Sequence, residues 1–215
     1  MLNMTKNWLV FTILVLCSMN AIAQKDFSAR EILNKTKEQM QNNGAISATF
    51  TTTLFDGTTP QEIFSGTMDI KGQKYVMKTD AVCTWFNGQD QWTLVHNSNE
   101  VSLVTPTQDE LKVSSPLSFM EIYHSGFKLS SKTAYLRGRK VWEVTMRPEN
   151  RKQEPSSIII SIDQETYTPM CLRIRNNGDW TRISINDLST RSSLPDEHFN
   201  FPSQDYPNYE VIDMR

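Results

Sequence analysis

The sequence has few of the residues from which catalytic and metal sites are built. Its 215 residues include three cysteines and three histidines. The histidines (His96, His124 and His198) stand singly, without a His-Glu-x-x-His pair or another metal-ligand spacing. A Gly-x-Ser-x-Gly elbow and a phosphate-binding loop are also missing. We therefore expect that the protein is not an enzyme and uses no metal or cofactor.

Charge of one sign is not concentrated along the chain. There are 22 basic and 24 acidic residues, which give a formal net charge of −2. The basic residues come only in short clusters, such as 137–140 and 151–152. A nucleic-acid-binding protein usually carries an extended basic patch, so we expect no nucleic-acid partner.

Long apolar runs are absent except at the N-terminus, where Trp8 to Cys17 is almost wholly apolar and follows Lys6. The run is too short to span a bilayer, and Ala21 and Ala23 form a small-x-small cleavage site behind it. This pattern predicts a secretory signal peptide at residues 1–23, and therefore export, with a mature single domain at 24–215.

The alternative for the N-terminus is lipidation. A lipoprotein cleavage box would make Cys17 the acylated residue, but such a box requires a small side chain just before the cysteine, and Leu16 is large. Cleavage after Ala23 leaves two cysteines, Cys83 and Cys171. An oxidising compartment permits a disulfide, but the two lie in separate strand patterns, so we expect two free thiols.

A single helix is predicted at the start of the mature chain. Ser28 and Glu31 have the spacing of a capping box, and the run Asn42 to Gly44 is a stop signal. An apolar stripe along this helix predicts that it covers an apolar surface; the stripe consists of Ile32, Leu33, Thr36 and Met40.

Most of the remaining chain alternates apolar and polar residues and predicts β-strands. Pro116 begins a second short helix, Leu117 to Ser125. The fold class is mainly β with helices (α+β): a sheet this long tends to curl into an incomplete antiparallel β-barrel, or half-barrel, with a helical lid, which either packs solid or keeps a cavity. The resemblance described below implies an apolar cavity. The predicted strands are 46–54, 62–70, 74–79, 81–86, 91–96, 101–104, 127–129, 134–136, 141–146, 157–162, 170–175 and 180–185.

Two tryptophans flank a turn in the stretch "WFNGQDQW" (85–92). A loop of two or four residues places Trp85 and Trp92 on the same face of the hairpin, whereas three would split them. The even loops sort the neighbouring apolar residues better, so both rings are expected to face the interior. Alternation does not separate solid core from the wall of a cavity.

A series of short motifs, taken in their order and spacing, resembles the LolA-type outer-membrane lipoprotein carriers over 27–215. A helix precedes "GAISATFT", "SGTMDIKG" forms the second strand, and "NGQDQW" matches an Asp/Asn-Gly before an aromatic residue. Glu100-Val101, the helix near Pro116 and the ending "FNFP…YEVIDMR" follow. Each motif alone is weak, and their succession carries the resemblance.

The resemblance implies a soluble, monomeric periplasmic carrier that holds the acyl chains of lipidated proteins and moves them from the inner to the outer membrane. The donor would be an inner-membrane ABC-type lipoprotein-release complex. Methionines suit a flexible, featureless ligand. We expect an acyl-chain cavity of Phe50, Leu54, Met68, Met77, Trp85 and Trp92. We expect a lid that includes Ile32, Leu33, Met40, Leu117, Met120 and Tyr123.

One departure from the family concerns the turn after the second strand. Well-studied branches of the family carry an arginine there that is thought to tie the lid to the barrel, and this sequence has Lys71-Gly72-Gln73. A lysine lacks the planar fork of arginine. Three alternatives to the carrier stay open: a lipid-anchored receptor or sensor of similar fold, a periplasmic binder of another hydrophobic ligand, and an unrelated extracellular β-protein.

Overall fold

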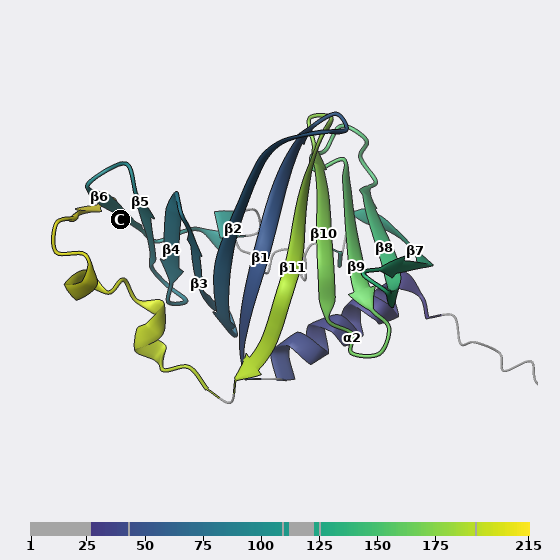
Figure 1. Cartoon of the computed structure of the whole chain (residues 1–215), viewed down its shortest axis with the longest axis horizontal. Helices are drawn as coiled ribbons and strands as arrows, with labels where there is room; N and C mark the ends of the chain where they lie inside the picture. Colours follow the sequence, from purple (N-terminus) through teal and green to yellow (C-terminus); the bar gives the residue numbers. More distant parts are fainter. Residues whose placement is uncertain (1–26, 43, 109, 112–122, 125, 192) are drawn as a thin grey trace, which may run out of the picture.

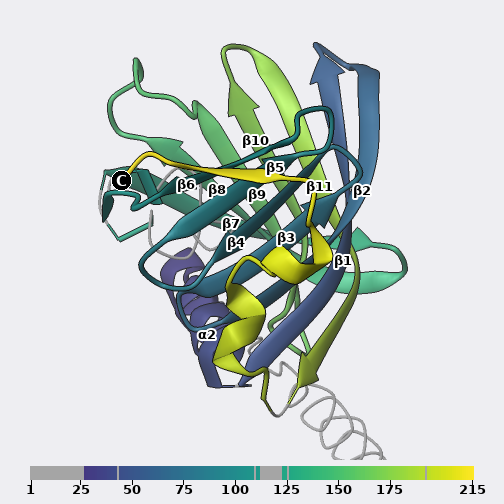
Figure 2. The ribbon, with the colours of Figure 1, turned by 90° about the vertical axis from the view of Figure 1, so that its left-hand side faces the viewer.

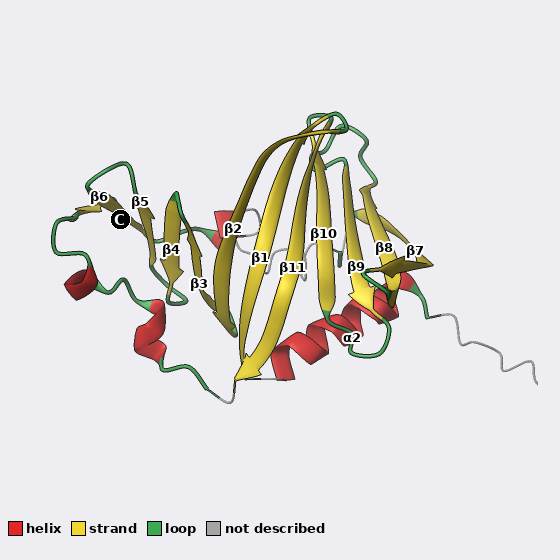
Figure 3. Cartoon of the chain, in the orientation of Figure 1, coloured by secondary structure: helices red, strands yellow, loops and turns green. Residues whose placement is uncertain are grey.

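The computed structural model describes residues 27–42, 44–108, 110–111, 123–124, 126–191 and 193–215. They include helix α2 (Ala29–Asn42), helical residues at 108 and 110–111, two short 3-10 helices and a twelve-stranded sheet (Figures 1 and 3). No helix in these residues is long and apolar enough to cross a membrane. The predicted cleavage site (Ala21 and Ala23) and the lid positions Leu117 and Met120 lie outside the described residues.

Antiparallel hairpins account for most of the sheet, in the order β12-β6-β5-β4-β3-β2-β1-β11-β10-β9-β8-β7. The strands are β1 (Ala45–Asp56), β2 (Thr59–Lys71), β3 (Lys74–Thr79), β4 (Val82–Phe86), β5 (Gln91–Val95), β6 (Glu100–Val104), β7 (Phe127–Leu136), β8 (Arg139–Pro148), β9 (Ser157–Asp163), β10 (Pro169–Asn176), β11 (Asp179–Arg191) and β12 (Glu210–Asp213).

The sheet is open, because β12 and β7 are its two edges and do not pair with each other. The long strands β1 and β11 pair in its middle and join the two halves of the chain. The predicted strands 127–129 and 134–136 are one continuous strand, β7, so their separation was wrong. The short β12 runs parallel to β6 and had not been predicted.

Helix α2 begins as the sequence predicts. The backbone N–H of Ser28 donates to the Glu31 carboxylate at 2.8 Å, and the Glu31 N–H donates to the Ser28 hydroxyl at 3.2 Å. These reciprocal bonds form the capping box and satisfy donors at the exposed helix end. The helix ends at Asn42, the first residue of the predicted stop.

The sheet bends so that one face is concave, and α2 lies on that face (Figure 2). We call it the concave face and the opposite side the convex face. Antiparallel partners point to the same side, so the register assigns each strand residue to a face. On the concave side, Ala48 pairs with Met68, and Met68 pairs with Met77.

Gly66 on β2 allows the Phe50 ring of β1 and the Lys78 carbonyl of β3 to approach its backbone closely. A Cβ at this position would lie 2.6 Å from the Phe50 ring and 2.5 Å from the Lys78 carbonyl oxygen. The ring could rotate away, but the carbonyl belongs to the paired strand β3. The Phe50 ring therefore covers a glycine, a known device for filling sheet positions without a side chain.

Replacing Gly66 with alanine should destabilise the protein by about 1–3 kcal/mol, the usual cost of overpacking. Urea unfolding followed by circular dichroism measures the change. Thr67→Ala is the control, since Thr67 is exposed and already carries a Cβ. An unchanged unfolding midpoint in Gly66→Ala would contradict the crowding.

Candidate functional site

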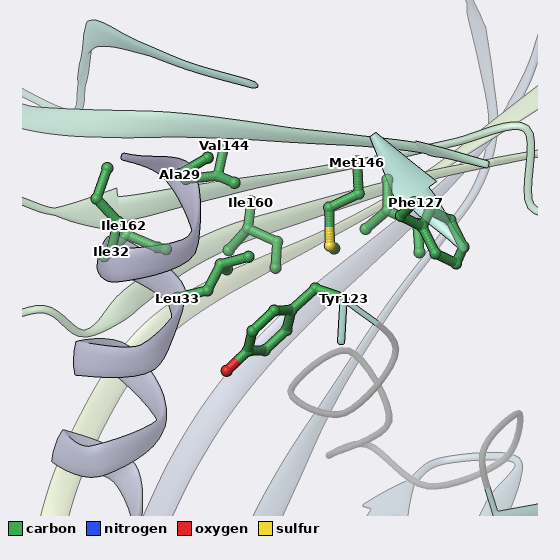
Figure 4. Packing of buried hydrophobic residues seen from close by; sticks show 10 residues of the cluster. Ala29, Ile32, Leu33, Tyr123, Phe127, Val144, Met146, Ile160 and Ile162 are labelled. Carbon is green, nitrogen blue, oxygen red and sulfur yellow. The ribbon is translucent and has the colours of Figure 1, made fainter. Parts of the chain in front are cut away.

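The N-terminal half of α2 packs on the concave face of β8 and β9 (Figure 4). Ile32 and Leu33 are 0% and 2% exposed. Tyr123 joins them and donates its hydroxyl hydrogen to the Asn34 side-chain oxygen at 2.9 Å. The helix and the chain at Tyr123 thus cover the same apolar surface. Its strand residues are Val144, Met146, Ile158, Ile160 and Ile162.

The other end of α2 covers the neighbouring part of the same face. Met40 is buried against β1–β4, in a cluster with Ile46, Ile70, Tyr75 and Phe86. Between the two clusters, Thr36 is buried and donates its hydroxyl hydrogen to the Ile32 carbonyl at 3.0 Å. The predicted stripe therefore faces the sheet along the helix, which confirms its orientation.

An apolar patch extends beyond α2 toward the β1–β2 hairpin. Its members are only partly buried, and the register places them side by side on the concave face of β1, β2, β3 and β11. We call them the open apolar patch: Leu54, Phe64, Met68, Met77, Ile183 and Ile185. Phe50 lies among them and is buried.

Part of this patch was predicted from the sequence. Leu54, Met68 and Met77 were predicted, as was Phe50, and the structure brings these four onto one face. Phe64, Ile183 and Ile185 were missed. The strand register would have identified them, because cross-strand partners lie on the same face. Phe64 and Ile183 are both partners of Thr52 on β1, and Ile185 is the partner of Phe50.

The two tryptophans do not belong to this face. Trp85 and Trp92 are cross-strand partners on β4 and β5, and the connecting loop has four residues, so the expected shared facing is confirmed. Trp85 also pairs with Val76, the residue before Met77 on β3. Adjacent strand residues point to opposite sides. Both rings therefore lie on the convex side, and their placement with Met68 and Met77 was wrong.

The convex side of β3–β6 is covered by the end of the chain, residues 193–215, which we call the C-terminal strap (Figure 2). The strap contains η1 (Asp196–Phe199), η2 (Ser203–Asp205) and β12. Trp85 is 1% exposed, and its ring meets Phe201 and Tyr206 edge-on at centroid distances of 5.3 and 5.7 Å. Trp85 is therefore core under the strap.

Polar contacts fasten the strap to the sheet. The amino groups of Lys71 and Lys74 lie 2.8 and 2.9 Å from the two carboxylate oxygens of Asp196. These hydrogen bonds and the two positive charges lower the pKa of Asp196 to about 2. His198 Nε2 lies 2.8 Å from the Asp69 carboxylate. Pairs this exposed contribute little individually, and they fix where the strap lies.

Lys71 therefore has a different task from the one proposed for the family arginine. Its amino group also donates to the Leu194 carbonyl at 2.7 Å. Every hydrogen bond described for the Lys71 side chain reaches the strap on the convex side. The contacts described for α2 include its apolar packing, the Asn34–Tyr123 bond and a hydrogen bond from Lys35 to the Tyr167 hydroxyl at 3.3 Å.

Cys83 and Cys171 are free and buried, as expected. The Sγ atom of Cys83 lies 3.4 Å from His96 Nε2, a neighbour that was not predicted because the pairing of β4 with β5 brings it there. Burial raises the pKa of the Cys83 thiol, and Lys78 only partly opposes this. A protonated, buried thiol is a poor nucleophile.

The described residues contain no group of three or more metal-ligating side chains.

The open apolar patch on the concave face is formed by apolar side chains. The patch presents thioether and aliphatic side chains, which change rotamer readily. The described buried side chains leave no polar atom without a hydrogen-bond partner. Such a surface can hold a flexible apolar ligand.

Comparison with known proteins connects this architecture with a family. The family described as outer membrane lipoprotein carrier protein LolA matches residues 19–178. Because the match covers most of the chain, the protein belongs to this family. The matched part includes α2 and β1–β10; β11 and the C-terminal strap follow it. No curated protein matches the sequence.

Three solved structures are similar to this chain at low sequence identity. A conserved protein from Thermus thermophilus superposes with a TM-score of 0.60 at 10% identity, covering 86% of this chain and 98% of that one. A putative outer membrane lipoprotein-sorting protein domain from Vibrio parahaemolyticus gives 0.46 at 13%, covering 80% and 96%. A LolA superfamily protein from Nitrosomonas europaea gives 0.42 at 10%, covering 81% and 98%. The first of these supports the shared fold.

Proposed function

We propose that the protein is a soluble periplasmic carrier that binds the acyl chains of lipidated proteins and moves them from the inner to the outer membrane. The donor would be an inner-membrane ABC-type release complex. One observation carries the proposal: the concave apolar surface continues beyond α2 as a partly exposed patch. Family membership suggests the class of ligand, and the predicted signal peptide suggests the compartment.

The physics of the patch suits an acyl chain. Burying one methylene contributes about 0.8 kcal/mol, so about ten methylenes supply about 8 kcal/mol before the costs of ordering. No hydrogen bond is needed, because the ligand has no polar atoms along its length. A longer chain would need the area under α2, which packs on the sheet through its apolar stripe.

The second candidate is a periplasmic binder of another hydrophobic ligand, which the same surface would serve. Native mass spectrometry of protein purified from the periplasm of its host separates the two. Co-purified lipoprotein supports the carrier, whereas a free lipid or small apolar molecule supports the binder. The intact mass also distinguishes cleavage after Ala23 from acylation at Cys17, which would indicate an anchored receptor.

Met68→Glu should reduce the affinity for a fluorescent fatty acid at least tenfold. A carboxylate in the patch must be desolvated or neutralised when the ligand covers it. The matched control is Thr67→Glu, which adds the same charge one residue away on the exposed convex side. Fluorescence titration measures both affinities. Equal affinities in the two folded variants would show that the open apolar patch is not part of the binding site.

A further inference from the structure

The cations on the convex face form a cluster that the order of the sequence conceals. One cross-strand row of the sheet contains Lys128 paired with Arg147, and Arg175 paired with Trp180. The neighbouring row contains Arg173 paired with Arg182. We call these five basic residues the convex band. They come from β7, β8, β10 and β11, so positions far apart along the chain share one surface.

The convex band is positively charged, although the whole chain is slightly acidic. Its two rows contain five cations and no carboxylate among the residues paired across β7–β11. The adjoining row contributes Lys132 and one carboxylate, Glu143, which lies 2.7 Å from Arg173 and 3.6 Å from Lys132. The formal net charge of the chain is −2. A local positive field therefore exists on a protein whose total charge has the opposite sign.

Apolar side chains border the band where the β1–β2 and β10–β11 hairpins meet. The Gly57 N–H donates to the Asp179 carboxylate at 3.2 Å and holds the two tips together (Figure 1). Ile63 is 65% exposed. The guanidinium groups of Arg175 and Arg182 lie 5.8 and 5.2 Å from the rings of Trp180 and Phe55.

The tips also carry acidic side chains, which limits where a negative surface could approach. Asp56, Glu62 and Asp179 are exposed there. Glu62 pairs with Leu54 and therefore points to the concave side. Asp179 is engaged by Gly57. The favourable approach is thus along the convex face, where Arg175 and Arg182 stand beside Ile63 and Trp180.

We propose that the convex band is a docking surface for a bilayer containing anionic phospholipid. The cations are spread over a sheet surface instead of converging on one point, which fits many phosphates in a plane better than one bound anion. Neighbouring strands are about 4.8 Å apart, so the band is about 20 Å wide. Aromatic and aliphatic side chains beside arginines are typical of groups at the membrane–water interface.

The proposed surface lies on the opposite side of the sheet from the open apolar patch. It would let the proposed carrier rest on a membrane while its concave face stays free. The inference depends on the charge of the convex face and not on the identity of the ligand. Failure of membrane docking would therefore leave acyl-chain binding intact, and the reverse also holds.

Vesicle co-sedimentation of the mature protein tests the inference. We expect binding to vesicles of equal parts phosphatidylglycerol and phosphatidylcholine, weakening as salt is raised, and little binding to pure phosphatidylcholine. Each surface cation contributes about 1 kcal/mol, or about fivefold in affinity, near an anionic membrane. The triple variant Lys128→Gln, Arg175→Gln, Arg182→Gln should therefore bind about a hundredfold more weakly.

The matched control makes the same change in charge elsewhere. Arg30→Gln, Lys140→Gln, Arg191→Gln removes three exposed cations outside the band and should bind almost as the unmodified protein does. Thermal unfolding checks that both triple variants are folded, and Lys128→Gln alone, expected to lose about fivefold, replaces the band variant if it is not.

Ile63→Ser tests the apolar border of the band. It should weaken vesicle binding a few-fold without changing its salt dependence, because no charge is removed. Equal loss in the band and control triples would overturn the inference, since total charge would then explain binding. Absence of binding to the anionic vesicles would also overturn the inference. If the protein were then retained on immobilised polyglutamate, the convex band would be assigned to an acidic protein partner.

Discussion

Removal of the C-terminal strap should leave the protein without a stable fold. A chain that ends at Arg191 would expose the convex apolar surface of β3–β6, including Trp85 and Leu94, which are 1% and 0% exposed in the full chain. It would also lose β12, leaving β6 as an uncovered edge. Exposed apolar surface beside an open strand edge favours aggregation.

A point substitution should reproduce much of this effect. Trp85→Ala removes the ring that packs against Phe201 and Tyr206, and large-to-small changes of a buried aromatic residue cost about 3–5 kcal/mol. A domain is typically stable by about 5–15 kcal/mol, so the variant should lose a large share. Urea unfolding measures the loss, together with the yield of soluble protein for the truncated chain.

Trp180→Ala is the matched control, because Trp180 is a partly exposed ring on the convex face away from the strap. Its unfolding free energy should change by less than about 1 kcal/mol. A truncated chain that stays soluble and unfolds at the same urea concentration as the full chain would show that the strap is not part of the core.

The sequence predicted which strand residues lie next to each other better than it predicted which face of the sheet they lie on. Alternation and the four-residue loop correctly put Trp85 and Trp92 together. They could not say which face of the hairpin is concave, since β4 is buried on both: Phe86 lies toward α2 and Trp85 under the strap. The signal that was overlooked is the aromatic content of the tail. Its rings, Phe199, Phe201, Tyr206 and Tyr209, needed an apolar partner.

Long-range pairing was the second limit. The hairpins could be predicted from local turns, but the pairing of β1 with β11 joins distant parts of the chain, such as Ala45 with Arg191. The convex band depends on that pairing and on the register of β7–β11. The same basic residues look scattered along the chain, so the sequence alone excluded a basic patch that the fold creates.

Leu33→Asp should detach α2 from the concave face. Leu33 is surrounded by apolar residues, including Ile160 and Tyr123, and no described cation faces it. Burial of an unpaired carboxylate costs several kcal/mol. The described contacts of the helix with the rest of the chain include apolar packing, the Asn34–Tyr123 bond, a hydrogen bond from Lys35 to the Tyr167 hydroxyl and contacts of Lys35 with the Phe27 and Tyr167 rings. Apolar packing is the contact that a buried charge at Leu33 weakens.

Hydrogen exchange followed by mass spectrometry would show the change as faster exchange in 29–42 and in β8 and β9, with β1–β3 less affected. Burial raises the folded-state pKa of the introduced carboxyl above its unfolded value. The penalty is therefore full above the raised pKa and disappears as the pH falls below the ordinary value of about 3.9. Arg30→Asp places the same group on the exposed side of α2 and should leave exchange unchanged. Equal exchange in both variants at neutral pH would mean that α2 is not held by its apolar stripe, and that it is not the element whose opening admits a ligand.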